Sequence, residues 1–128
     1  MKLLLDTATF LWIVTEDPRL SNYARKLFLD PDNKRYLSAI STWEIALKNS
    51  LGRLSLPEAV DQYVPAQREK HGIESLPLEE EQTLYLARLP RLHRDPFDRM
   101  LVCQALAHGL VLLSPDPVFS QYPVRTIW

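Results

Sequence analysis

Short blocks of apolar residues alternate along the chain with longer blocks in which apolar residues recur at helical spacing. The apolar blocks have the length of buried strands, and they cover residues 3–5, 35–39, 73–76, 110–113 and 124–127. The helical blocks cover residues 9–14, 19–29, 41–51, 57–64, 78–89 and 96–107. Strands and helices that take turns in this way indicate right-handed β-α-β crossovers. We therefore expect an α/β fold with a largely parallel sheet of about five strands.

Local signals predict where several helices begin and end. Ser41 and Glu44 have the spacing of a helix-capping box, which predicts a helix start there and an end near Gly52. Pro57 suits the first position of the next helix. Pro65 comes directly after residue 64 of this run and is expected to kink or divide the helix if it continues.

Aspartates precede prolines at two further expected helix starts. Asp95 precedes Pro96, so Asp95 is expected to cap a helix that runs through Ala107 and ends near Gly109. Asp116 precedes Pro117 and predicts a short helix after the fourth strand.

Composition narrows the class of protein. The 128 residues suit a single domain spanning 1–128, and a net charge of −1 argues against a generally basic nucleic-acid binder. Cys103 is the only cysteine, which excludes an intrachain disulfide and suits a reducing cytoplasm. No uncharged run approaches the length of a membrane span, so we expect no membrane contact.

Four carboxylates stand out along the chain, three after strand-like runs and the fourth, Asp98, at the start of a helical run. They are Asp6, Glu44, Asp98 and Asp116. In an open α/β sheet the carboxyl ends of parallel strands form one edge, where ligands bind. Acids gathered at one edge repel each other unless a cation lies among them, and hard oxygen ligands suit Mg²⁺ or Mn²⁺. The pattern therefore predicts metal-assisted phosphate chemistry.

Each acid also has a simpler interpretation when taken alone. Glu44, Asp95, Asp98 and Asp116 all lie where a helix cap or first turn explains an acid without catalysis. Asp6 is harder to explain, because an acid that ends a buried strand is costly without a partner. The joint pattern is what favours a metal site.

Basic residues gather beside the acids. Lys48 and Arg53 follow Glu44, whereas Arg94 and Arg99 flank Asp95 and Asp98, together with Arg91 and His93. They form either a solvated surface or a rim that contacts phosphate. Lys48, Arg94 and Arg99 are the RNA contacts that we consider, and we expect His93 to lie at the surface.

The order and separation of these motifs resemble the PIN domain, most of all bacterial VapC-type toxins of type II toxin–antitoxin pairs. The resemblance spans nearly the whole chain, and its motifs are Leu3-Leu4-Leu5-Asp6-Thr7, Ser41-Thr42-Trp43-Glu44-Ile45-Ala46-Leu47-Lys48, His93-Arg94-Asp95-Pro96-Phe97-Asp98-Arg99-Met100-Leu101 and Leu112-Leu113-Ser114-Pro115-Asp116-Pro117-Val118-Phe119.

The resemblance implies a three-layer α/β/α fold and an Mg²⁺- or Mn²⁺-dependent endoribonuclease with a small antitoxin partner. It implies metal-binding and catalytic roles for the four acids, with Asp6, Glu44 and Asp98 holding the principal ion and Asp116 completing that site or holding a second ion. Asp95 is implied as an auxiliary acid, and Thr7 and Ser114 as supporting hydroxyls. Relatives often carry His where this chain has Ala8.

Two alternatives stay open at this point. The first is a PIN-like binding module that acts only through partners. The second is a phospho-acceptor signalling domain, which also places acids at strand ends but usually carries a pair of acids early in the chain. Exposed apolar surface on residues 9–14 and 43–51 leads us to expect a homodimer that also binds an antitoxin segment.

Overall fold

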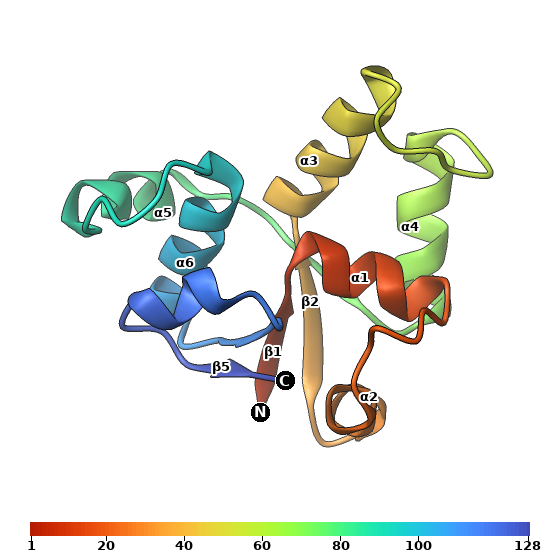
Figure 1. Cartoon of the computed structure of the whole chain (residues 1–128), viewed down its shortest axis with the longest axis horizontal. Helices are drawn as coiled ribbons and strands as arrows, with labels where there is room; N and C mark the ends of the chain where they lie inside the picture. The colour runs from red at the N-terminus through yellow and green to blue at the C-terminus, as the bar shows by residue number, and fades with distance from the viewer.

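The computed structural model describes residues 1–128, which fold around a five-stranded, all-parallel sheet in the order β3-β2-β1-β4-β5 (Figure 1). The strands are β1 (Lys2–Leu5), β2 (Lys34–Ser38), β3 (Glu74–Leu76), β4 (Val111–Leu113) and β5 (Thr126–Ile127). In the registers Leu4 pairs with Tyr36 of β2 and with Leu112 of β4, so β1 lies at the centre. The predicted parallel sheet is confirmed.

Helices fill the connections between the strands. They are α1 (Thr7–Val14), α2 (Asn22–Leu29), α3 (Ala39–Ser50), α4 (Val60–Lys70), α5 (Glu80–Tyr85) and α6 (Pro96–His108), with the 3-10 helices η1 (Leu86–Arg88) and η2 (Pro117–Gln121). No helix combines the length and the apolar character that crossing a bilayer requires.

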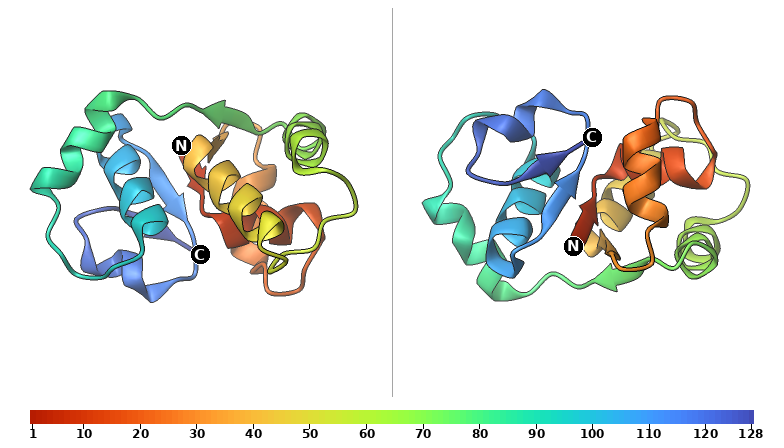
Figure 2. Two further views of the ribbon diagram at one scale, coloured as in Figure 1. Left: turned by 90° about the horizontal axis from the view of Figure 1, so that it is seen from above. Right: turned by 90° about the horizontal axis from the view of Figure 1, so that it is seen from below.

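The sheet separates two hydrophobic cores, because successive strand residues point to opposite faces. Leu3 and Leu5 pack with α1, α2 and α4 in one core, whereas Leu4 packs with α6 and η2 in the other. Figure 2 shows these two groups of helices on opposite sides of the sheet. The predicted three-layer α/β/α arrangement is confirmed.

The predicted capping box at Ser41 and Glu44 is wrong. Ser38, the last residue of β2, is the N-cap of α3, and its hydroxyl accepts from the backbone N–H of Ile40. The strand passes directly into the helix, so Ser41 and Glu44 both lie inside α3. Glu44 therefore reaches the sheet edge from the second turn of a helix rather than from a helix start.

Three other helix boundaries differ from the prediction. Ser21 caps α2, which therefore begins after residue 19. Helix α4 begins at Val60 rather than at Pro57 and continues through Pro65, because the buried Tyr63 and Val64 hold it against the core. The helical block at 78–89 divides into α5 and η1.

Glycines end two helices as predicted. Gly52 follows α3 and Gly109 follows α6, with φ angles of 70° and 64°. Non-glycine residues rarely adopt this left-handed conformation, so it suits the position just after a helix.

Candidate functional site

Asp6 lies at the carboxyl end of β1 and is only 7% exposed. One carboxylate oxygen, Oδ1, caps α1 by accepting the Thr9 N–H at 2.8 Å. The other, Oδ2, accepts the hydroxyl of Ser114 at 2.5 Å, and Ser114 follows the neighbouring strand β4. Burial raises the pKa of Asp6, and these hydrogen bonds oppose that rise. Asp6 thus has a capping role that the sequence did not reveal.

Glu44 is equally buried and points to the same edge from α3. Its Oε1 accepts the Thr7 hydroxyl at 2.6 Å, and its Oε2 pairs with the Lys48 ammonium at 2.5 Å, one helical turn on. The two hydroxyls that we singled out from the sequence, those of Thr7 and Ser114, therefore each contact one of the acids. Lys48 contacts an acid as well.

The two aspartates before and within α6 have different surroundings. Asp95 is the predicted N-cap, and its Oδ1 accepts the backbone N–H groups of Phe97 and Asp98 at 2.9 and 3.2 Å. Asp98 lies in the first turn, with its side chain largely covered. The capping oxygens belong to Asp95, so capping does not account for the Asp98 carboxylate.

Asp116 follows β4, where the chain turns into η2. Its Oδ1 caps that short helix by accepting the Val118 N–H at 3.0 Å, as predicted. Its own N–H donates to the Ser114 hydroxyl at 3.1 Å. Ser114 therefore links Asp116 to Asp6 through a hydrogen bond on each side.

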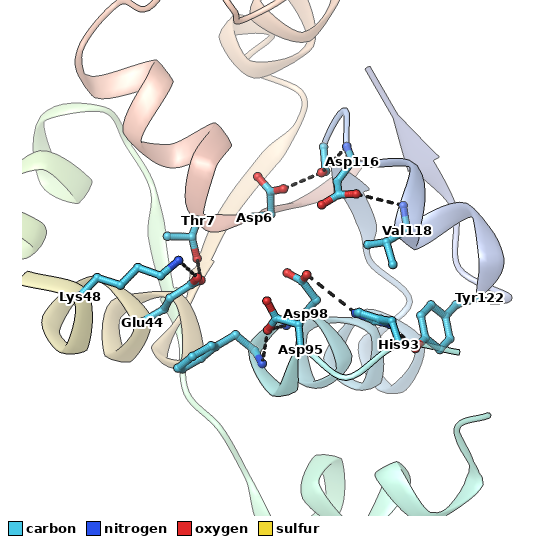
Figure 3. Close-up of polar contacts among 12 residues, drawn as sticks. Asp6, Thr7, Glu44, Lys48, His93, Asp95, Asp98, Asp116, Val118 and Tyr122 are labelled. Atoms are coloured by element: carbon cyan, nitrogen blue, oxygen red, sulfur yellow. Dashed lines mark hydrogen bonds and ion pairs between the residues drawn. The ribbon is translucent and has the colours of Figure 1, made fainter. Parts of the chain in front are cut away.

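The four acids and Asp95 line one cavity of about 410 Å³. Figure 3 shows their carboxylates arranged around a shared space at the sheet edge. Lys48 and Thr7 also line it, together with Arg53, Ala8, Leu11 and Leu54. The two leucines are not marked by any sequence signal, because their place here depends on how α1 and the segment after α3 pack.

The negative charge of the cavity shows in the pKa of Asp98, which is raised to about 7. Burial is the largest cause, followed by repulsion from Asp95, Asp116, Glu44 and Asp6. Every other acid of the cavity therefore acts on Asp98. A divalent cation among them would remove this repulsion.

The chemistry of the donor set suits a hard cation, since carboxylate oxygens are the ligands that Mg²⁺ and Mn²⁺ prefer. No three His, Cys, Asp or Glu side chains are already gathered in a group that could hold an ion. Glu44 instead pairs with Lys48, and Asp6 accepts the hydroxyl of Ser114. The residues fit a metal through their type and common cavity.

His93 is only partly exposed, rather than a free surface residue as expected. Its Nδ1 is 2.5 Å from the hydroxyl oxygen of Tyr122, and its Nε2 is 3.8 Å from Asp98 Oδ2 (Figure 3). Its side chain is 16% exposed. Tyr122 lies far along the chain, so only the tertiary structure reveals this contact. Arg94 and Arg99 do not line the acidic cavity but a neighbouring one that also includes His93.

The PIN domain family model matches residues 3–124. The chain belongs to the PIN domain family. Its predicted membership is confirmed, and the match disfavours the phospho-acceptor alternative. Ribonuclease VapC16 of Mycobacterium tuberculosis (strain ATCC 25618 / H37Rv) is 36% identical to this PIN domain over 72 residues. That match covers 53% of this chain and about half, 51%, of the relative.

Solved structures share the fold of this PIN domain over nearly its whole length. A DNA-bound VapBC from Salmonella typhimurium has a TM-score of 0.69 at 18% identity, covering 99% of this chain and 97% of that chain. VapBC2 from Rickettsia felis, bound to a DNA fragment from its promoter, has a TM-score of 0.67 at 16% identity, covering 99% and 98%. At sequence identities of 16% and 18%, this structural similarity supports the assignment of the fold.

Proposed function

We propose that this chain is a metal-dependent endoribonuclease and the toxin of a type II toxin–antitoxin pair. The observation that carries the proposal is the single cavity lined by Asp6, Glu44, Asp98 and Asp116, which come from four separate segments. A protein that only binds partners has no need to gather several carboxylates in one cavity at a cost in repulsion. The similarity to Ribonuclease VapC16 supports the choice of RNA as substrate.

We propose Asp6, Glu44 and Asp98 as ligands of the principal ion, with Asp116 completing that site or holding a second ion. Mg²⁺ or Mn²⁺ held there would supply the Lewis acid that polarises the scissile phosphate, assists deprotonation of the attacking water and stabilises the leaving oxygen. Asp95 is the auxiliary acid, because its cap holds the first turn of α6, which carries Asp98.

The neighbouring side chains hold the ligands in place. Ser114 donates to Asp6, and Thr7 donates to Glu44, so each hydroxyl restricts the rotation of one carboxylate. Lys48 neutralises part of the charge of Glu44 and lines the cavity, and we propose that it contacts the phosphate of RNA there. This arrangement matches the way in which outer contacts orient metal ligands.

The partner of the toxin would be a small antitoxin protein. Three of the structures similar to this chain are VapBC structures, two of them bound to DNA. The single cysteine, Cys103, is buried and free, which suits the cytoplasm that we propose as the site of action. Copurification with the product of a short adjacent reading frame would test the partnership.

The nuclease activity is tested by incubating the purified protein with structured and unstructured RNA in Mg²⁺, in Mn²⁺ and in EDTA. We expect cleavage only with a metal. Asp6→Asn should lower the rate by more than about 100-fold, because changing the outer partners of a metal ligand alone costs about 10–100-fold.

Asp61→Asn is the matched control, since Asp61 is an exposed aspartate of α4 that lies outside the cavity. It should cleave like the wild type. Cleavage that survives both EDTA and Asp6→Asn would reject the mechanism. A protein that binds RNA but never cleaves it with either metal would favour the binding module.

A further inference from the structure

A second cavity adjoins the acidic one, and its lining carries the opposite charge. It has a volume of about 470 Å³ and is lined by Arg91, Leu92, His93, Arg94 and Arg99. No carboxylate is among these residues. Guanidinium groups remain protonated at physiological pH, so three arginines give this cavity a permanent positive charge.

These arginines have no anionic partner within the chain. The ion pairs of the structure join Arg19 to Asp17, Lys48 to Glu44 and His93 to Asp98, and none includes Arg91, Arg94 or Arg99. The Nε of Arg99 is buried and lacks a hydrogen-bond partner. The exposed guanidinium groups of Arg91 and Arg94 are therefore available to an anion from another molecule.

The basic cavity lies directly beside the acidic one. Arg99 follows Asp98 in α6, so consecutive residues line the two cavities. His93 lines the basic cavity while its Nε2 lies 3.8 Å from Asp98 Oδ2, and Figure 3 shows it on the side of Asp98 away from Glu44. An RNA strand whose scissile phosphate lies in the acidic cavity would bring its adjacent phosphate towards the arginines of the basic cavity.

We propose that Arg91, Arg94 and Arg99 form a subsite for the RNA backbone phosphate next to the one that is cut. This inference rests on the proposed ribonuclease function. Arginine binds phosphate through paired hydrogen bonds, and a chain of net charge −1 must bind RNA through a local patch. Leu92 is the only apolar residue of the lining, which favours a phosphate over a peptide segment.

Binding of labelled single-stranded RNA to inactive Asp6→Asn protein in EDTA tests the subsite. The double substitution Arg91→Gln and Arg94→Gln removes two exposed arginines and should raise Kd roughly tenfold at low salt. The slope of log Kd against log salt concentration should fall by about 0.7 for each lost phosphate contact.

Arg125→Gln is the matched control, because Arg125 is an exposed arginine that precedes β5, at the opposite edge of the sheet from the acids. It should leave both Kd and the salt slope unchanged. Arg99→Gln is measured separately with a thermal melt, since its Nε is buried. A folded Arg99→Gln protein should also bind RNA more weakly.

Cleavage in Mn²⁺ separates this inference from the proposed function. The arginine substitutions should lower kcat/KM more for a longer oligonucleotide than for a dinucleotide, which carries only the scissile phosphate. If the wild type cleaves neither substrate, the proposed function fails, while the binding measurements still decide the subsite. If the Arg91→Gln/Arg94→Gln protein binds RNA as tightly as Arg125→Gln does, the subsite is overturned. The subsite is also overturned if the variant keeps its affinity for RNA but no longer copurifies with an acidic protein that the wild type binds, since the arginines would then contact a protein partner.

Discussion

Asp98 is the residue on which the electrostatics of the acidic cavity act most strongly. Its pKa is about 7 in the folded protein, compared with about 3.9 in an unfolded chain. Between about pH 4 and about pH 7, the Asp98 carboxyl is therefore more often protonated in the folded state than in the unfolded state. The contribution of Asp98 to the free energy of unfolding is therefore favourable at low pH and is lost as the pH rises from about 4 to about 7.

We expect Asp98→Asn to raise the Tm of the metal-free protein, and to raise it more at pH 8 than at pH 5. The substitution removes a charge that burial and the other acids disfavour, so the gain should grow as the pH rises from about 4 to about 7. The measurement is a thermal melt in EDTA across this pH range. Nuclease activity in Mn²⁺ should collapse in the same variant.

Asp61→Asn again serves as the control, and its Tm should differ from that of the wild type by the same amount at every pH. An Asp98→Asn protein that is less stable at pH 8 yet fully active would show that Asp98 has a purely structural role. It would remove Asp98 from the proposed ligands.

At the scale of the elements, a buried hydrogen bond joins the two helices that carry Glu44 and Asp98. The hydroxyl of Ser38, the N-cap of α3, donates to Gln104 Oε1 on α6. Gln104 is fully buried, and its Nε2 donates to the Pro77 carbonyl at 3.2 Å. Gln104 thus ties α6 both to the start of α3 and to the loop after β3.

We expect Gln104→Leu to destabilise the protein by about 1–3 kcal/mol, because it leaves the Ser38 hydroxyl without an acceptor and the Pro77 carbonyl without its donor. A double-mutant cycle with Ser38→Ala should show a coupling of at least about 0.5 kcal/mol in urea unfolding. Ser50→Ala, also on α3, is the control and should be additive with Gln104→Leu. Additivity in both cycles would show that the two helices are not coupled through this bond.

At the scale of the whole molecule, three exposed apolar residues lie one helical turn apart along α3 and its C-cap. Trp43, Leu47 and Leu51 are 57%, 38% and 56% exposed, and the Trp43 ring packs edge-on against Phe97. Residues 9–14 contribute less exposed apolar surface than expected, since Phe10 and Ile13 are buried. The homodimer, like the single domain spanning 1–128, stays a prediction.

Light scattering at micromolar concentration should give the mass of a dimer. Trp43→Ser together with Leu47→Ser should shift the protein to monomer, because burial of these side chains is the expected driving force. Tyr23→Ser removes a similarly exposed aromatic, 53% exposed on α2, and should leave the dimer intact. A stable monomer of the unchanged protein would contradict the dimer.

The sequence by itself determined the alternation of strands and helices, the parallel sheet and the positions of the acids. These properties follow from local apolar patterns and from the rule that parallel strands end at one edge. The caps at Asp95 and Asp116 were also readable, because a short polar side chain before proline is a local signal.

The tertiary structure alone decided how the site is completed. Local signals placed a helix start at Ser41, but β2 runs directly into α3, and the cap moved to Ser38. The contacts of His93 with Tyr122, and of Ser114 with Asp6, join residues that are distant in the chain. Such pairs depend on how helices pack on the sheet, and packing involves long-range contacts that no local pattern encodes.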